Sequence, residues 1–243
     1  MADKKNEKVV GIIGGMGPEA TVDLMQRIIR LTPALDDIDH IRCVVDNNPK
    51  VPSRIKAIIE GTGVDPSPAI IDMAKRLESW GADFLVMPCN TAHHYYNQVN
   101  NGVNIPVIHL IKLVVHHICD TCPEVQHIGI LASPAVIMTN LYQEICDEYG
   151  LGVIYPETGD QNDLFNIIRK IKAGQTDGEL KDDFHRICDR LVEQGAEVVV
   201  IACTELSVIA EDLTASNVDA TEILAQEVVD IVKNKKNMRR MFR

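Results

Sequence analysis

The chain has 243 residues, of which 35 are Asp or Glu and 24 are Lys or Arg, so its formal net charge is −11. Nucleic-acid binding requires clustered Lys and Arg for phosphate contacts, and so acidic a chain argues against a nucleic-acid partner. Hydrophobic residues make up 46% of the sequence, which is enough for a full core without disulfides in one large or two small domains.

The cysteine pattern and the hydropathy pattern indicate the compartment. Seven cysteines are an odd number scattered over the whole chain, unlike the disulfide framework of a secreted protein. No apolar run approaches the roughly 20 residues that span a bilayer, and no signal-peptide-like segment precedes Val9. We therefore expect a cytoplasmic protein with free thiols and no membrane partner. The basic tail from Lys233 to Arg243 is interpreted as the solvated end of the last helix.

Short β-branched runs alternate with longer segments of helical periodicity, which is typical of an α/β protein with mostly parallel strands. We expect strands at Val9–Ile13, Ile41–Val45, Phe84–Met87, Val107–His109, His127–Leu131, Gly152–Ile154 and Val198–Ile201. We expect helices at Glu19–Leu31, Ser53–Glu60, Pro68–Trp80, His93–Val99, Ile111–Cys119, Ile137–Tyr149, Asp160–Lys172, Glu179–Glu193 and Asp219–Lys233.

An internal repeat is the most informative feature of this pattern. The segment from Leu77 to Asn90 aligns without a gap with the segment from Leu191 to Thr204: each ends a helix, continues through Gly-Ala into an apolar strand, and then has a Cys. The run Val10–Gly14 likewise resembles Ile128–Ala132. Any helix-Gly-Ala-strand unit looks alike, but that does not explain a Cys at the same offset in both.

The repeat predicts two pseudo-symmetric α/β domains, each a mostly parallel sheet flanked by helices. We expect the first to comprise residues 1–108 plus 214–243, with the C-terminal helix returning to it, and the second to comprise residues 109–213. The active site is expected in the cleft between them.

Cys89 and Cys203 each directly follow a predicted strand, where ligands bind in α/β folds. Backbone N–H groups and the dipole of a following helix favour a thiolate there. A single free Cys is more often a small buried hydrophobe. Two thiols facing one cleft, however, suit acid/base chemistry in which one removes a proton from a carbon and the other delivers one to its opposite face. A redox pair would more often be close in sequence, and structural zinc needs four ligands.

At these cysteines the sequence resembles the cofactor-independent aspartate/glutamate racemases. The matching segments are Gly11–Thr21, Asn48–Arg54, Pro88–His93 and Ala202–Leu206. The resemblance is closest to the aspartate racemase branch, because Thr-Glu follows the second Cys where glutamate racemases tend to have Thr-His. It implies a two-domain fold, Cys89 and Cys203 as the two bases, no cofactor or metal, and commonly a homodimer.

The resemblance also implies the substrate contacts. It places Arg54 and Lys172 on substrate carboxylates, where a guanidinium fork suits a carboxylate. Lys172 is open to a second interpretation, as the solvated basic end of a helix. The remaining expected site residues comprise substrate-binding Asn90, Thr91, Thr204 and Met16, and supporting Gly15, His93 and Glu205.

One position departs from the family pattern. The family often has an acidic residue where Ser53 stands before Arg54, so the local pairing that orients Arg54 is in question.

Two rival motifs remain open. Gly15–Ala20 formally matches G-x-G-x-x-A after a predicted strand, with acidic residues from Asp36 roughly 20 residues further on, as a dinucleotide site would have. Cys119 and Cys122, after His116 and His117, form half of a metal-site spacing without a second pair to complete it.

The sequence as a whole predicts a racemase that interconverts L- and D-aspartate without pyridoxal phosphate, metal or nucleotide. Glutamate racemase or a related isomerase of the same superfamily is the first alternative. A non-catalytic dicarboxylate-binding protein is the second, although such a protein would have no chemical need for paired thiols.

Overall fold

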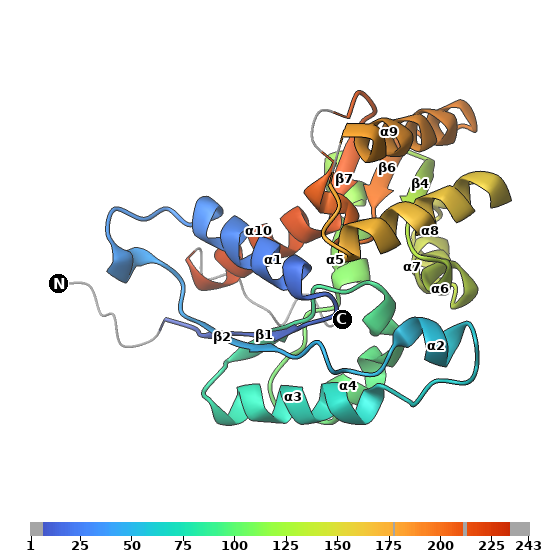
Figure 1. Ribbon diagram of the computed structural model, residues 1–243. Helices are drawn as coiled ribbons and strands as arrows, with labels where there is room; N and C mark the ends of the chain where they lie inside the picture. The colour runs from blue at the N-terminus through green and yellow to red at the C-terminus, as the bar shows by residue number, and fades with distance from the viewer. Residues whose placement is uncertain (1–6, 177, 211–212, 234–243) are drawn as a thin grey trace.

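The computed structural model describes residues 7–176, 178–210 and 213–233, and its strands form two parallel sheets (Figure 1). The first sheet has the order β2-β1-β3 and the second the order β5-β4-β6-β7. The strands are β1 (Val10–Gly14), β2 (Cys43–Asn47), β3 (Phe84–Val86), β4 (His127–Leu131), β5 (Gly152–Ile154), β6 (Val198–Ile201) and β7 (Asn217–Asp219). All the pairings between them are parallel, which confirms the predicted fold class.

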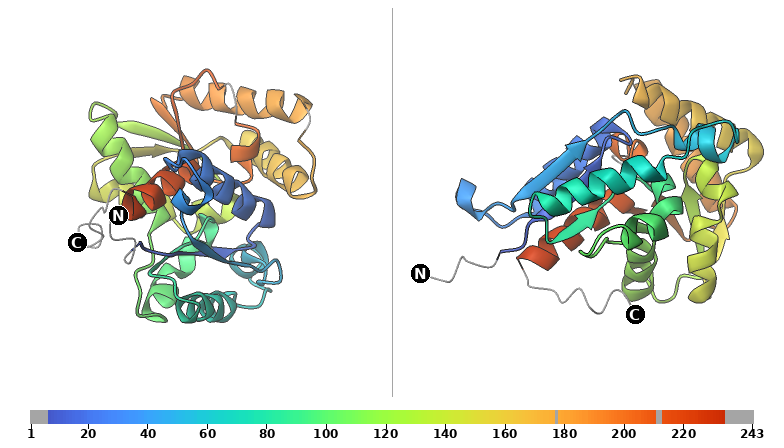
Figure 2. Two further views of the ribbon diagram at one scale, coloured as in Figure 1. Left: turned by 90° about the vertical axis from the view of Figure 1, so that its left-hand side faces the viewer. Right: turned by 90° about the horizontal axis from the view of Figure 1, so that it is seen from below.

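Helices cover both faces of each sheet. The longer ones are α1 (Pro18–Leu31), α3 (Ser67–Ser79), α5 (Leu110–Thr121), α8 (Thr158–Lys172), α9 (Gly178–Glu193) and α10 (Ala220–Val232). The shorter ones are α2 (Arg54–Ile58), α4 (Tyr96–Asn101), α6 (Pro134–Met138) and α7 (Leu141–Glu148), with 3-10 turns η2 (Asp37–Asp39), η3 (Thr91–Tyr95) and η4 (Leu206–Val208). Figure 2 shows α1 and α10 side by side on one side of the first sheet, with α3 on the other.

Strand alternation decides which core each side chain joins, because successive residues of a strand point to opposite faces. Phe84 and Val86 of β3 join the core that also contains α1, α5 and α10, whereas Leu85 packs with α3 on the outer face. In β6, Val198 and Val200 join the same inner core. That inner core is continuous from one sheet to the other and holds the two halves together.

The repeat seen in the sequence is also a repeat in packing. A Cβ on Gly11 of β1 would lie 2.9 Å from the Cβ of Ala82, and a Cβ on Gly129 of β4 would lie 2.9 Å from the Cβ of Ala196. Both distances are too short for a real side chain, so glycine permits the same close approach of chain in each half.

Two strand predictions need correction. Residues 107–109 were expected to be a strand, but only a single bridge between Leu85 and Val107 forms. The chain cannot extend further because His109 already caps α5, its ring accepting a hydrogen bond from the Lys112 N–H. Conversely, β7 was not predicted, because three residues are too few to show the alternation of apolar and polar side chains that indicates a strand.

Two predicted helices are each divided. The segment expected as Ile137–Tyr149 forms α6 and α7, because Asn140 between them adopts a left-handed φ of 51° that no helix accommodates. The segment expected as His93–Val99 forms η3 followed by α4. The other expected helices are confirmed with shifted ends.

The domain boundaries stay a prediction. β7 pairs with β6 in the second sheet, and α10 then packs against both α1 and α5. The chain after residue 214 therefore contacts both halves, and residues 234–243, with the basic tail interpreted above, lie outside the described residues.

Candidate active site

A cavity of about 380 Å³ lies between the two halves, beyond the carboxyl ends of β3 and β6. Open α/β sheets bind ligands at this edge, and the volume falls in the range of small-molecule sites. The cavity brings together residues from both halves that are far apart in sequence. Those expected from the sequence are Met16, Arg54, Cys89, Asn90, Thr91, Lys172, Cys203, Thr204 and Glu205.

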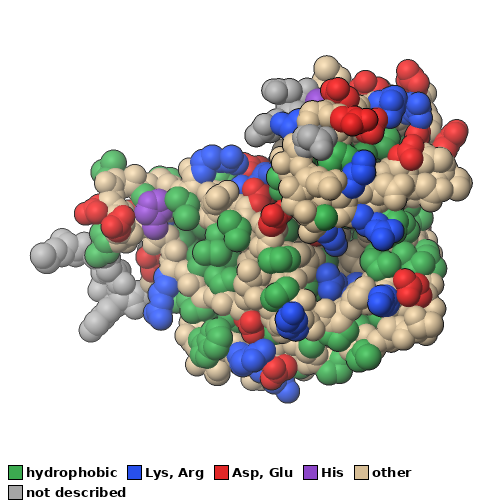
Figure 3. Space-filling model, viewed as in Figure 1, with side chains coloured by type: hydrophobic (Ala, Val, Ile, Leu, Met, Phe, Trp, Pro, Cys, Tyr) green, Lys and Arg blue, Asp and Glu red, His purple; other side chains and the backbone are tan. Residues whose placement is uncertain are grey.

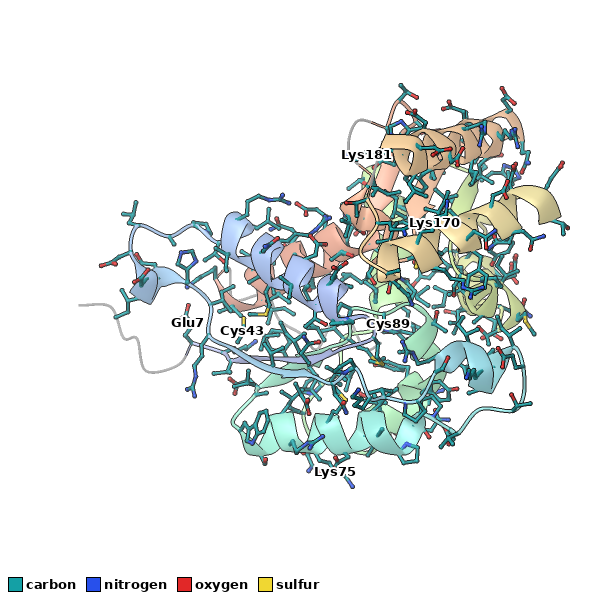
Figure 4. The ribbon with its side chains drawn as sticks, viewed as in Figure 1. Glu7, Cys43, Lys75, Cys89, Lys170 and Lys181 are labelled. Atoms are coloured by element: carbon teal, nitrogen blue, oxygen red, sulfur yellow. The ribbon has the colours of Figure 1, made fainter. Side chains whose placement is uncertain are left out.

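The two cysteines reach this cavity from equivalent positions of the two sheets. Cys89 follows β3 and is 7% exposed, and Cys203 follows β6 and is 9% exposed. In Figure 4, Cys89 lies in the middle of the molecule, between the half that contains α3 and the half that carries α8. Both thiols therefore have restricted contact with water while lining one cavity.

Cys203 is hydrogen-bonded to a buried carboxylate. Its thiol donates to Oε2 of Glu205 at 3.1 Å, and Oε1 of Glu205 lies 3.2 Å from Nζ of Lys172. Burial, followed by the charge of Glu205, raises the pKa of Cys203 well above 9.0, although Lys172 opposes the shift. Cys203 is therefore a neutral thiol in this arrangement.

Lys172 is the last residue of α8, and its side chain turns into the cavity. Burial opposes its charge, but Glu205 and the two cysteines outweigh burial and raise the pKa of Lys172 above 10.5. The ammonium is therefore kept protonated. The Lys172 side chain is 43% exposed at the end of α8, as the second interpretation expects, and its Nζ also pairs with Glu205 at the cavity, so both interpretations stay open.

Arg54 is oriented by backbone carbonyls. One terminal nitrogen donates to the Pro52 carbonyl at 3.2 Å and the other to the Met16 carbonyl at 3.3 Å. Its Nε is buried without a hydrogen-bond partner among the described residues. Ser53 caps α2, its hydroxyl accepting from the Lys56 N–H at 3.3 Å. The question raised by Ser53 is thereby answered: carbonyl groups hold the guanidinium where the family often has an acid.

Polar side chains link the halves around the cavity. Tyr142 donates to Oδ1 of Asn90 at 2.9 Å, and the hydroxyls of Thr91 and Ser133 are 3.0 Å apart. Thr204 donates to the Pro88 carbonyl at 3.4 Å. Neither Ser133 nor Tyr142 was among the expected site residues. The similarity of Val10–Gly14 to Ile128–Ala132 was a usable signal for Ser133, since it gives Ser133 the place that Gly15 has in the first half. No sequence motif around Tyr142 indicated that it would contact a site residue.

Two expected supporting residues lie outside the cavity lining. His93 is 3% exposed; its Nε2 accepts from the Leu110 N–H at 3.0 Å, which places its proton on Nδ1, 2.9 Å from the Cys89 carbonyl. Burial lowers the pKa of His93 to about 4, so the ring is neutral. Gly15 has a φ of 88°, and a Cβ there would lie 2.3 Å from the Asn48 backbone. Both residues contact backbone beside the cavity.

The rival motifs have structural explanations. The glycines of the G-x-G match allow close packing, because a Cβ on Gly15 would lie 2.3 Å from the Asn48 backbone and one on Gly17 would lie 3.2 Å from Glu205. Cys119 and Cys122 lie at the end of α5. Across the described residues, no group of three or more His, Cys, Asp or Glu side chains is arranged to hold a metal ion.

All seven cysteines are free, as expected. Burial raises the pKa of Cys43 to about 11 and those of Cys146 and Cys188 to about 12, so these thiols stay protonated at neutral pH. In the part of the chain that the structure describes, no helix combines the length and the apolar character that crossing a bilayer requires.

The outer wall of the cavity is mixed in character. Ile55, Phe165 and Ile168 supply apolar surface, while Lys56 and Arg169 add positive charge beyond Arg54 and Lys172. Figure 3 shows Lys and Arg side chains on both sides of the boundary between the two halves. The carboxylates of Glu60 and Glu205 offset part of this charge, and the lining of the cavity still carries more positive than negative groups, which favours anionic ligands.

Residues 13–228 match the family model described as Asp/Glu/Hydantoin racemase. The chain belongs to this family. The resemblance seen in the sequence is thereby confirmed, and membership supports isomerase chemistry on small amino-acid substrates.

Individual relatives agree with this assignment. The chain is 27% identical over 233 residues to the broad specificity amino-acid racemase RacX of Bacillus subtilis, covering 91% of this chain and 96% of RacX. The structure is similar to that of an aspartate racemase from Picrophilus torridus, with a TM-score of 0.80 and 27% identity over 97% of this chain and 99% of the other. An aspartate racemase homologue from Pyrococcus horikoshii shares the fold, with a TM-score of 0.73 and 22% identity over 93% of this chain and 99% of the other.

Proposed function

We propose that the protein interconverts L- and D-aspartate by two-base proton transfer between Cys89, Cys203 and the substrate α-carbon. One observation carries the proposal: two thiols at equivalent ends of two sheets line the same cavity. The family assignment supports racemase chemistry, and the similarity to an aspartate racemase supports the choice of substrate.

In one direction the thiolate of Cys89 removes the α-proton, and the neutral thiol of Cys203 gives its proton to the opposite face. The electron pair of the broken C–H bond stays on the substrate, shared between the α-carbon and its carboxylate, until the new C–H bond forms, so no cofactor is required to balance the step. Cys203 ends as a thiolate close to the Lys172 ammonium, which stabilises it. In the reverse direction the two roles exchange.

Substrate binding is assigned to the polar side chains of the cavity. Arg54 and Lys172 supply the two positive charges that a dicarboxylate needs, and charge-assisted hydrogen bonds to carboxylates are among the stronger ones in proteins. Asn90, Thr91 and Thr204 supply hydrogen-bonding groups near the two thiols. Met16 contributes through its carbonyl, which holds Arg54 in place.

A broader amino-acid substrate range is the second candidate, and the outer wall favours it. Ile55, Phe165 and Ile168 give apolar surface that an aspartate side chain, with a single methylene, does not need. The similarity to the broad specificity racemase RacX points the same way. Under this candidate the same cysteines act on longer or less acidic side chains.

The test is racemisation in D₂O with chelator present and without added cofactor. The enantiomers of aspartate, glutamate and methionine are supplied separately, and products are separated by chiral chromatography and analysed by mass. We expect L-aspartate to give D-aspartate carrying deuterium at the α-carbon, with little deuterium in the remaining L-aspartate at early times. Faster conversion of methionine would favour the broader range. Retained α-protium in the product would overturn proton abstraction, and binding of aspartate without exchange would favour a non-catalytic binding protein.

The homodimer, the cytoplasmic location and the two-domain boundaries complete the proposal as predictions. Sedimentation velocity of the purified full-length protein measures the first directly, since a dimer has twice the chain mass of 26.9 kDa.

A further inference from the structure

We propose that Tyr142 is a positioning residue, whose hydroxyl fixes the side-chain amide of Asn90 with its NH₂ group toward the substrate. The inference rests on the proposed function, because it takes the cavity to be the substrate site. It concerns a residue from the second half of the molecule that acts through a residue of the first half.

The two side chains meet in a fully buried contact between the halves. Tyr142 lies on α7, is 0% exposed, and belongs to the inner core shared by both sheets. Asn90 directly follows Cys89, is 3% exposed, and lines the cavity. Their Oη and Oδ1 atoms are 2.9 Å apart, and each atom is out of reach of bulk water.

The direction of this hydrogen bond follows from counting donors and acceptors. With Tyr142 donating to Oδ1, the phenolic proton and the amide oxygen are both satisfied. If the amide were turned over, its NH₂ would donate to the phenol, and the phenolic proton would lose its acceptor. The phenol lies in the core, where a ligand cannot pair with its proton, whereas the NH₂ group of Asn90 lies on the cavity lining, where a ligand can pair with it, so the first arrangement is favoured.

The consequence appears on the other side of the amide. Nδ2 of Asn90 is buried and has no hydrogen-bond partner among the described residues. An amide held by its oxygen, on the cavity lining, presents two N–H donors to a ligand. Such donors match an anionic oxygen and repel an ammonium group. The contact therefore selects a carboxylate at this wall and stabilises the negative charge that moves onto it as the α-proton leaves.

Tyr142 stays a donor throughout the working pH range. Burial, followed by the charges of Cys146, Tyr155 and Asp219, raises its pKa well above 10.0. The phenol therefore keeps its proton, and Asn90 keeps its orientation, at any pH at which the cysteines exchange protons.

The first experiment compares Tyr142→Phe with Asn90→Ala and with the double variant. Tyr142→Phe keeps the ring and removes the hydroxyl, so we expect kcat/KM to fall about 10-fold, the effect of a lost buried hydrogen bond. In the Asn90→Ala background the same change should have less than about a twofold effect, because interactions within a pair are not additive. Full additivity of the two losses would overturn the inference.

A matched control uses the buried hydroxyl of Tyr155, which has no hydrogen-bond partner in the described part of the chain. Tyr155→Phe removes an equivalent group from the core near Tyr142 without touching Asn90. We expect wild-type kinetics for this variant. A loss equal to that of Tyr142→Phe would show a general packing effect and overturn the inference.

The last measurement does not depend on turnover. In protein labelled with ¹⁵N, the side-chain amide signals of Asn90, assigned by their absence in Asn90→Ala, should shift and exchange faster with solvent in Tyr142→Phe and remain unchanged in Tyr155→Phe. Unchanged Asn90 signals in Tyr142→Phe would overturn the inference even in an active enzyme. If shifted signals accompany a wild type that racemises no amino acid, the positioning contact stands and the proposed function fails.

Discussion

The thiol of Cys203 donates to Oε2 of Glu205 at 3.1 Å, while Oε1 of the same carboxylate lies 3.2 Å from Nζ of Lys172. The repeat gives Cys89 no such acid, because Thr91 stands at the offset that Glu205 occupies after Cys203. The two halves thus supply thiols in equivalent places and in different electrostatic surroundings. The raised pKa of Cys203 suits a site in which one thiol must stay protonated until it delivers its proton.

Glu205→Gln should move the alkaline limb of the pH profile to lower pH. Racemisation loses activity at high pH when the second thiol ionises, and burial with Glu205 raises the pKa of Cys203. Removing the carboxylate charge lowers that pKa, although burial keeps it raised. The same substitution also lowers the pKa of Lys172, because the charge of Glu205 is the main cause that raises it. The profile of kcat/KM is measured from pH 6 to 11 with each enantiomer.

The two enantiomers should give the same kcat/KM at each pH, since their equilibrium constant is one. Glu222→Gln is the matched control, because Glu222 pairs with Arg27 and Arg30, and it lies outside the cavity lining. An alkaline limb that does not move in Glu205→Gln would remove Glu205 from control of Cys203.

Cys89→Ser and Cys203→Ser should each reduce racemisation by orders of magnitude, because a serine hydroxyl ionises far above neutral pH. Each variant keeps one thiol, so each should still exchange the α-hydrogen of one enantiomer with D₂O, and the two variants should differ in which one. Cys122→Ser, at the end of α5, is the control and should behave like wild type. Wild-type turnover in either active-site variant would contradict the two-base assignment.

Local signals in the sequence were sufficient for most of the sheets and for the cysteine pair. The alternation of side chains in β3 and β6 is visible within short segments of sequence. The close packing at Gly11 and Gly129 is visible because the two segments repeat each other. The break at Asn140 escaped prediction because the apolar periodicity runs through it while the backbone turns left-handed. Periodicity reports which face is buried and carries little information on such a turn.

The contacts that orient the site were beyond prediction from sequence. Arg54 is held by the carbonyls of Pro52 and Met16, and every residue has a carbonyl, so no residue type marks this role. Tyr142 meets Asn90 only because two halves pack together over the inner core. Family resemblance supplied Arg54 and Lys172, whereas the partners that fix them required the fold.

Arg54→Ala should raise KM for aspartate steeply. A lost charge-assisted contact is worth about 1.5–3 kcal/mol, which corresponds to roughly 10- to 150-fold. Arg54→Lys should restore only part of the loss, because an ammonium cannot reproduce the planar fork that bonds two carbonyls and a carboxylate. Steady-state kinetics and calorimetric binding of the dicarboxylate succinate measure the effect. Near-normal values for Arg54→Ala would place the carboxylate contact elsewhere.

Lys172→Ala should also weaken aspartate binding, and it should raise the pKa of Cys203 further by removing a charge that lowers it. The alkaline limb of kcat/KM then moves to higher pH, opposite to the shift in Glu205→Gln. Lys170→Ala is the control, since Lys170 lies on the same helix and outside the cavity lining (Figure 4). A variant with unchanged KM and an unchanged alkaline limb would exclude Lys172 from the site.

His93 should make folding stability dependent on pH in the mildly acidic range. Its pKa falls from 6.5 to about 4 in the folded protein because of burial, so the unfolded chain binds a proton at a higher pH than the folded chain does. Stability is then fully present above pH 6.5, decreases as the pH falls from 6.5 to 4, and loses about 3 kcal/mol from this residue, at about 1.36 kcal/mol per pKa unit. His109, with its pKa lowered to about 3 chiefly by burial, contributes in the same direction.

Denaturant unfolding between pH 4 and 8 measures how steeply the free energy of unfolding depends on pH. His93→Gln should reduce this pH dependence and leave the part that comes from His109. His94 is exposed, so His94→Gln should leave the pH dependence unchanged. If His93→Gln kept the wild-type slope, the neutral ring between the Cys89 carbonyl and the Leu110 N–H would not be the source of the pH dependence.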